Sequence, residues 1–116
     1  MIHGTHNAEP DKRNNDVLIY INGELFKRAE AKISVFDSGY LVGDGVWEAM
    51  RLYNGVLAFS NQHLDRWWAG AAAIGMDMNF SREELLEKIH LTLDANDMHT
   101  DVHVRIMLTR GTKTTP

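Results

Sequence analysis

The sequence predicts a small domain in which short antiparallel strands are combined with two helices. Two Asn-Gly pairs, Asn22-Gly23 and Asn54-Gly55, each lie between apolar stretches, and this dipeptide is a strong signal for a hairpin turn. Two longer segments, 60–75 and 81–96, instead repeat apolar residues at the spacing of one helix face. The chain has 116 residues, which is enough for at most one domain with a modest core.

The composition excludes several classes of protein. Charged residues make up 24% and hydrophobic residues 44%, as in a soluble globular domain, and the net charge of -4 without a dense basic run argues against a nucleic-acid surface. The absence of cysteine excludes disulfides, a zinc–thiolate site and a thiol nucleophile. No apolar run reaches membrane-spanning length, and no secretory signal is visible. We therefore expect a cytoplasmic protein with no membrane or nucleic-acid partner and no metal site.

The first part of the chain is expected to be a tail followed by a hairpin. Residues 1–16 hold almost no apolar side chains, which indicates a flexible N-terminal tail. Residues 17–21 alternate as a strand does and are apolar on both faces, and residues 24–26 are the expected partner strand. We expect a connector at 28–31 and another short extended segment at 32–36.

The segment 37–45 carries two glycines around an aspartate, in Gly43-Asp44-Gly45. Glycines at this spacing indicate positive φ angles and close approach of the backbone. A tight turn explains the pattern, and so does backbone that lines a ligand pocket. The motif is not a phosphate-binding P-loop, because no Gly-Lys-Ser/Thr follows it.

Residues 46–53 are predicted to form a strand with one charged side chain on each face. Glu48 shares one face with apolar residues, whereas Arg51 shares the other face with Trp47. A solvated edge explains such charges, and so does a pocket wall, because buried charges need partners or a ligand. Residues 56–59 are the expected return strand.

The helix expected after this hairpin is capped by Ser60 or Asn61 and ends at Gly75. Its apolar face comprises Leu64, Trp67, Trp68, Ala71 and Ile74. Arg66 lies in its second turn. It is either a surface arginine paired with Asp65 or another nearby carboxylate, or an arginine that binds a phosphate, which suits its forked geometry.

The end of the chain predicts a helix, a strand and a linker. The second helix begins with a capping box, Ser81 to Glu84, and ends near Asn96. Residues 102–109 alternate as a strand does, with Arg105 in the middle. The polar run TRGTKTTP that follows is expected to open a connection to a further domain.

Three of these segments together resemble the class IV aminotransferases, the pyridoxal-phosphate enzymes of fold type IV. The segments are VFDSGYLVGDGVWEAMRLYNG, HLDRW and TRG, and the similarity runs in the same order from about Leu18 to Gly111. The resemblance implies an α+β N-terminal domain over 17–111, with an antiparallel sheet packed by two helices. It also implies a larger C-terminal domain, pyridoxal 5'-phosphate in the cleft between the two domains, and a homodimer.

The resemblance further implies roles for four residues of this chain. Arg66 matches the arginine of the family's H-x-x-R-L motif, which binds the cofactor's phosphate. Trp47 takes the place of an aromatic residue that faces the substrate. Arg51 and Arg105 align with arginines near the substrate carboxylate in branched-chain aminotransferases, whereas D-amino-acid aminotransferases use an arginine and a histidine shortly after TRG, and this pair is absent from 112–116. We therefore predict transamination of the branched-chain type, between amino acids and 2-oxo acids.

The family's catalytic lysine belongs to the C-terminal domain. Five lysines are present here, and none matches its context: Lys12, Lys27, Lys32, Lys88 and Lys113. We therefore expect no catalytic residue in this chain, which we interpret as the N-terminal part of a longer enzyme, inactive alone, with 112–116 opening the interdomain linker. D-amino-acid aminotransferase, aminodeoxychorismate lyase and (R)-amine transaminase are alternatives of the same fold. A different class is a non-catalytic dimerising or binding module, with Trp67, Trp68 and the strand edges at its interface.

Overall fold

A computed structural model describes residues 9–115 of the chain. The chain divides into two compact units, with the boundary between Ala31 and Lys32. Residues 1–8 of the expected tail, and Pro116 at the end of the expected linker, lie outside the described residues. None of the helices within 9–115 is long and apolar enough to span a membrane.

The first unit is a two-stranded hairpin between short 3-10 turns. Strands β1 (Leu18–Ile21) and β2 (Glu24–Lys27) are antiparallel, and Asn22 and Gly23 between them have φ angles of 50° and 97°. Two successive positive φ angles are what a tight hairpin turn requires, so the predicted hairpin is confirmed. The 3-10 turn η2 (Lys12–Asn14) lies in the segment expected to be a tail, and η3 (Arg28–Glu30) occupies the expected connector.

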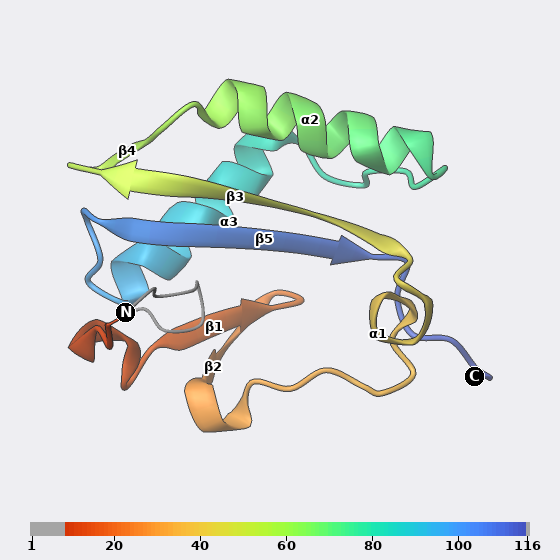
Figure 1. Cartoon of the computed structure of the whole chain (residues 1–116), viewed down its shortest axis with the longest axis horizontal. Helices are drawn as coiled ribbons and strands as arrows, with labels where there is room; N and C mark the ends of the chain where they lie inside the picture. Colours follow the sequence, from red (N-terminus) through yellow and green to blue (C-terminus); the bar gives the residue numbers. More distant parts are fainter. Residues whose placement is uncertain (1–8, 116) are drawn as a thin grey trace, which may run out of the picture. The chain divides into compact units, whose positions relative to one another are not determined.

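The second unit is built on a three-stranded antiparallel sheet in the order β4-β3-β5. Its strands are β3 (Gly45–Tyr53), β4 (Val56–Leu57) and β5 (Val102–Thr109), and its helices are α1 (Ser38–Val42), α2 (Ser60–Ala73) and α3 (Arg82–Ala95). Strands β3 and β5 pair along most of their length, with Ala49 opposite Arg105. Helix α2 runs beside β3, and α3 lies behind the two long strands (Figure 1). An α+β domain whose antiparallel sheet is packed by two longer helices is therefore confirmed.

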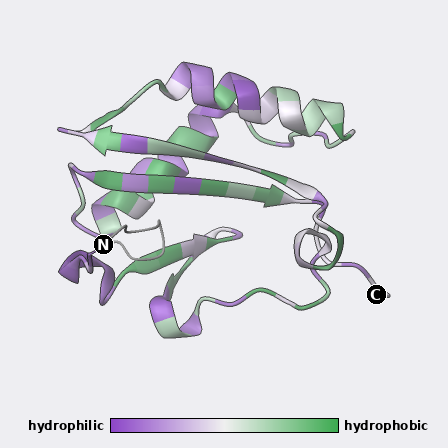
Figure 2. Ribbon diagram, in the orientation of Figure 1, coloured by the Kyte–Doolittle hydropathy of each residue, from purple (hydrophilic) through white to green (hydrophobic). Residues whose placement is uncertain are grey.

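The core of this unit lies between one face of the sheet and the two longer helices. Bands of hydrophobic and hydrophilic residues follow one another along β3 and β5, and α2 changes from hydrophilic at its start to more hydrophobic at its end (Figure 2). The buried apolar side chains include Met50, Leu52, Leu64, Trp67, Ile89, Leu93 and Ile106. Because side chains alternate along a strand, every second residue lies on this face. For this reason the sequence predicted which residues of the strands share a face.

Four expectations for the chain around β3 were wrong. Residues 32–36 form no strand, and the segment expected to be irregular contains α1, whose first turn is capped by the Asp37 carboxylate accepting from the Gly39 N–H at 2.8 Å. Strand β4 ends at Leu57 instead of continuing to residue 59. The reason is Phe59, which takes a φ of 54° and is itself the N-cap of α2, without a side-chain hydrogen bond. The expected caps, Ser60 and Asn61, are instead the first two residues of the helix.

Candidate functional site

Strand β3 presents one charged side chain on each of its two faces. Glu48 is only 4% exposed and lies on the core face, together with Met50 and Leu52. Trp47 is 57% exposed and lies on the opposite face, as does Arg51. The side chains named in the sequence analysis are therefore divided between two surfaces of the same strand.

Glu48 is a buried carboxylate surrounded by hydrogen-bond donors. The Nε of Arg66 donates to Oε2 at 2.7 Å and its Nη2 donates to Oε1 at 2.7 Å, which makes a bidentate ion pair. The Nδ1 of His63 lies 3.0 Å from Oε1, and the backbone N–H of Ala49 donates to Oε1 at 3.2 Å. A buried charge with this many donors is well satisfied.

The donors around Glu48 change its titration. The hydrogen bonds from Arg66 make the largest contribution, and those from His63 and Ala49 add to it, so that the pKa of Glu48 falls from 4.5 to about 2 despite burial. The same carboxylate raises the pKa of Arg66. Glu48 and Arg66 are therefore an ionised pair across the pH range in which enzymes work.

The ion pair uses only one edge of the Arg66 guanidinium. Nε and Nη2 face Glu48, which leaves both hydrogens of Nη1 and the second hydrogen of Nη2 to bind another acceptor. The Arg66 side chain is 73% exposed, so this second edge faces outward. Asp65, one of the partners considered from sequence, instead pairs with Arg82 at 2.6 Å.

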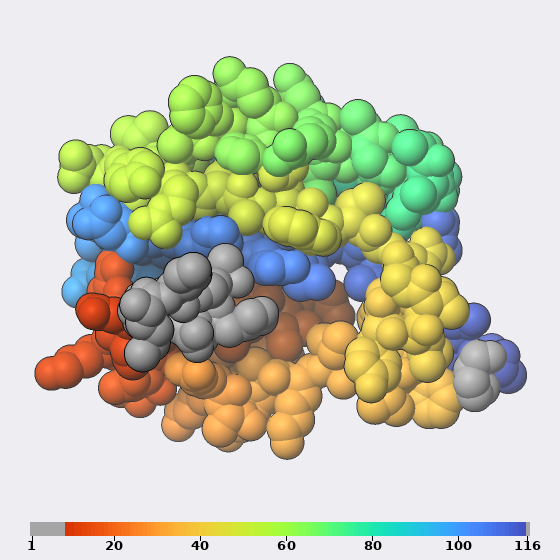
Figure 3. Space-filling model, viewed as in Figure 1, coloured from red at the N-terminus to blue at the C-terminus, as the bar shows by residue number. Residues whose placement is uncertain are grey.

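Strands β3 and β5 bring the other candidate residues together on the opposite face. The register places Trp47 opposite Met107, Ala49 opposite Arg105, and Arg51 opposite His103, so Arg51 and Arg105 are diagonal neighbours. The guanidinium carbon of Arg105 lies 4.3 Å from the centre of a Trp47 ring, within the range of a cation–π contact. Atoms of β3 and β5 are visible at the surface in Figure 3. This surface combines two cations with an exposed aromatic ring, which suits a small anionic organic molecule.

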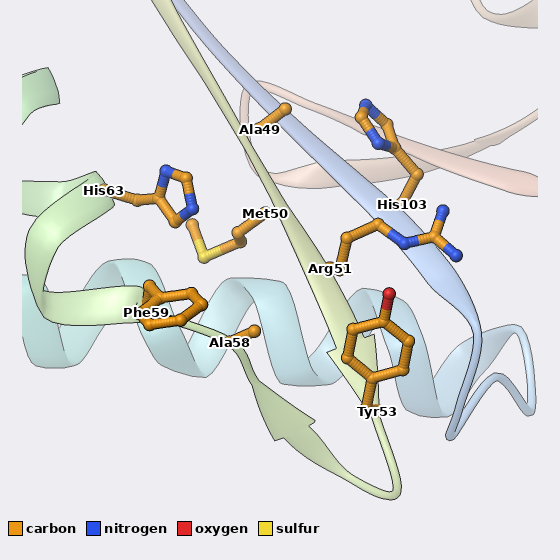
Figure 4. A pocket seen from close by; sticks show the side chains of 8 residues that line it. All are labelled: Ala49, Met50, Arg51, Tyr53, Ala58, Phe59, His63 and His103. Atoms are coloured by element: carbon orange, nitrogen blue, oxygen red, sulfur yellow. The ribbon is translucent and has the colours of Figure 1, made fainter.

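A pocket of about 290 Å³ lies where α2 begins beside β3. Its lining includes His63 and Phe59 from the α2 side and Arg51, Tyr53 and His103 from the strands. In Figure 4, His63 and Phe59 lie on one side of the β3 ribbon, and Arg51 and Tyr53 lie on the other. Within the described residues, β4 pairs with β3 only at Leu52 and Tyr53, so the earlier part of this edge carries no neighbouring strand.

The two glycines around Asp44 have separate structural reasons. Gly43 has a φ of 69°, which favours glycine, whereas a Cβ on Gly45 would lie 2.6 Å from the carbonyl oxygen of Leu108 in β5. Asp44 accepts from Nε of Arg110 at 2.7 Å, and this contact joins the two glycine-containing motifs of the sequence. Both glycines therefore have a structural reason within this chain, a positive φ at Gly43 and the close approach of β5 at Gly45.

The sequence analysis missed the role of Glu48. The available signal was a single carboxylate among apolar residues on one strand face, and the strand pattern showed that it needed a partner. The pattern could not identify that partner, because Arg66 follows 18 positions later on another element. No group of three or more potential metal ligands occurs among residues 9–115.

Comparisons with known proteins agree on one family. The model of the family described as amino-transferase class IV matches residues 45–115. The chain is 42% identical over 106 residues to branched-chain-amino-acid aminotransferase-like protein 1 of Arabidopsis thaliana, covering 91% of this chain and 19% of that protein. It is 43% identical over 93 residues to the D-alanine aminotransferase of Staphylococcus aureus (strain MSSA476), covering 80% of this chain and 33% of that enzyme. The chain thus spans a third or less of the length of these relatives.

Solved structures with a similar fold come from the same group of enzymes. The branched-chain aminotransferase from Thermoproteus uzoniensis with norvaline superposes with a TM-score of 0.75 at 25% identity, over 88% of this chain and 36% of that one. The T.th. branched-chain amino acid aminotransferase complexed with N-(5'-phosphopyridoxyl)-L-glutamate also gives a TM-score of 0.75, at 26% identity, over 88% of this chain and 35% of that one. Most of this chain therefore matches a part of each of these enzymes.

Proposed function

Because this chain belongs to the class IV aminotransferase family, we propose that it is the N-terminal part of a pyridoxal-phosphate-dependent aminotransferase. The observation that carries this proposal is the outward edge of Arg66, which is held by a buried carboxylate and offers unused N–H donors. A rigid guanidinium with parallel donors suits a phosphate monoester better than a flexible ammonium does. The residues present therefore fit the phosphate end of the cofactor.

Pyridoxal phosphate, when bound, supplies the electron-withdrawing ring through which an amino group passes from an amino acid to a 2-oxo acid. In this proposal, the residues of this chain hold and orient the cofactor and the substrate. Arg66 would bind the phosphate and keep the ring from drifting, since a displacement of about 1 Å can cost on the order of a hundredfold in rate. The proton-transferring lysine is proposed to lie outside this chain, because Lys12, Lys27, Lys32, Lys88 and Lys113 are all exposed and none lines the pocket beside α2.

Arg51 and Arg105 are proposed to bind the substrate carboxylate, with Trp47 shaping the space for its side chain. Their shared face of β3 and β5 supports this assignment, because two cations on one small surface attract a carboxylate. We propose that the enzyme is a cytoplasmic homodimer and that its substrates are branched-chain amino acids and their 2-oxo acids.

A second candidate is a D-amino-acid aminotransferase. It is favoured by the 43% identity to a D-alanine aminotransferase, which is as high as the identity to the branched-chain-like relative. The two candidates differ in the hand of the amino donor. Activity with L-leucine or L-valine and 2-oxoglutarate supports the first, whereas activity with D-alanine alone replaces it by the second.

The test of the proposed function is Arg66→Ala in the full-length protein. Loss of a charged hydrogen-bonding partner is worth about 1.5–3 kcal/mol, so pyridoxal-phosphate affinity is expected to fall about 10- to 100-fold. Asp65→Asn is the matched control, because Asp65 is next to Arg66 on α2 and its loss removes only an ion pair with Arg82 of α3. The affinity of this variant for pyridoxal phosphate should match that of the wild type. Unchanged cofactor affinity in Arg66→Ala would remove the basis of the proposal.

A further inference from the structure

Glu48 is the charged residue of β3 that the proposed function leaves without a role. It touches none of the surface that carries Arg51 and Arg105, since its side chain points to the core face. Its contacts are with Arg66, His63 and its own neighbouring amide. Burial of a carboxylate is costly, and a well-packed apolar side chain in its place is often equally stable. Fold stability alone therefore gives little reason for a glutamate at this position.

The geometry of the pair limits how the guanidinium can turn. An arginine with a 73% exposed side chain would ordinarily sample several rotamers, but two parallel bonds of 2.7 Å fix the plane of this one. Glu48, which holds the guanidinium, is itself fixed in place. Its side chain is 4% exposed, and it lies in the middle of β3, which pairs with β5. Because Glu48 already holds the Arg66 guanidinium in one orientation, the side chain loses less conformational entropy when it binds a ligand.

His63 completes the anchor from the first turns of α2. Its Nδ1 lies 3.0 Å from the same oxygen of Glu48 that accepts from Nη2 of Arg66. His63 and Arg66 are three residues apart on one helix, so they share a face and converge on one carboxylate. The contact with His63 gives the carboxylate a second partner from α2, which restrains it in addition to the bonds with Arg66.

We infer that Glu48 is a positioning residue for phosphate recognition: it aims the outer edge of Arg66 at the phosphate monoester of the cofactor and contacts the cofactor only through Arg66. This inference rests on the proposed function. The ion pair is neutral overall, so it recognises phosphate by the direction of its remaining N–H bonds more than by net charge. Without Glu48, Arg66 keeps its charge but loses its orientation.

The experiment compares two ligands that differ only in the phosphate. Dissociation constants for pyridoxal phosphate and for pyridoxal are measured on the apo form of the full-length enzyme, and their ratio isolates the phosphate contact. Glu48→Gln keeps the shape of the side chain but cannot accept both Arg66 bonds. Its pyridoxal-phosphate affinity should fall 10-fold or more, with pyridoxal affinity within about threefold of the wild type. Asp65→Asn is the control and should leave the ratio unchanged.

The outcomes separate the inference from the proposed function. If Arg66→Ala lowers the ratio and Glu48→Gln does not, or if Glu48→Gln weakens both ligands equally, Glu48 is structural and the inference is overturned. If Arg66→Ala leaves the ratio intact, the proposed function itself fails. In the Arg66→Ala background, Glu48→Gln should change the ratio no further, because Glu48 acts only through the arginine. Should Glu48→Gln not fold, Glu48→Asp replaces it: the shorter carboxylate cannot reach both nitrogens, and an unchanged ratio in that variant equally overturns the inference.

Discussion

At the scale of single residues, the main feature is a charge that is buried and yet fully paired. Glu48 tolerates its position because donors from three residues converge on its two oxygens. The neighbouring residue Trp47 faces the other way and packs its ring against Arg105. One step along the strand therefore separates the network proposed to bind phosphate from the surface proposed to bind a carboxylate, since successive side chains of a strand point to opposite faces.

The stability of the protein should depend on the ionisation of Glu48. Its pKa is lowered from 4.5 to about 2 on folding, so the stability it contributes is fully present above pH 4.5 and is lost as the pH falls toward 2. We expect the difference in thermal midpoint between wild type and Glu48→Gln to be largest near neutral pH and to shrink below pH 4.5. A series of melting curves between pH 7 and pH 3 measures this, and a difference independent of pH would contradict the assigned pKa.

At the scale of elements, the two longer helices begin in different ways. Helix α3 begins with a complete capping box, in which Ser81 Oγ accepts from the Glu84 N–H at 3.1 Å and the Glu84 carboxylate accepts from the Ser81 N–H at 3.1 Å. Helix α2 has a serine at its first residue, but its N-cap is Phe59 in a left-handed conformation. The serines at the two helix starts thus look alike in sequence and act differently.

These two serines form a matched pair of variants. Ser81→Ala removes a side-chain cap and should cost about 1 kcal/mol of unfolding free energy, and hydrogen exchange at the Glu84 amide should become faster. Ser60→Ala removes no cap and should change stability by less than about 0.5 kcal/mol. Urea unfolding and amide exchange measure both effects. Equal costs for the two variants would show that Ser60 caps α2 after all, as the sequence alone suggested.

At the scale of the whole molecule, the chain matches only part of the length of its relatives and exposes many apolar side chains. Large apolar side chains are exposed along the segment before β3, among them Ile33, Val35, Phe36, Tyr40 and Val42. Where exposed apolar side chains gather on a protein surface, another surface often packs. The chain also spans only 19% and 33% of two of its relatives. Both observations agree with the proposal that further sequence completes the enzyme.

Chemical labelling of the whole protein tests where the reactive lysine lies. Borohydride reduction of the full-length enzyme with pyridoxal phosphate should add one pyridoxyl group, and peptide mass spectrometry should place it on a lysine outside residues 1–116. The reason is that all five lysines of this chain are exposed and carry no structure that would select one of them. Specific labelling of one of these five lysines would refute the proposal that the reactive lysine lies outside this chain. A protein that gains no specific label would favour the non-catalytic binding module.

The sequence by itself determined the long strands, the two longer helices and the faces of the strands, but not α1 or the N-cap of α2. Alternation along 46–53 and 102–109, the Asn-Gly turns and the Ser81 capping box are local patterns, and each reports a preference that acts within a few residues. The same patterns placed Trp47, Arg51 and Arg105 on strands, and the resemblance singled out Arg66. Only the tertiary structure decided which of them meet: Glu48 with Arg66, and Arg105 with Trp47. Such pairs depend on sheet register and on the packing of α2 beside β3, and these follow from burial of the shared core rather than from any local stretch of the chain.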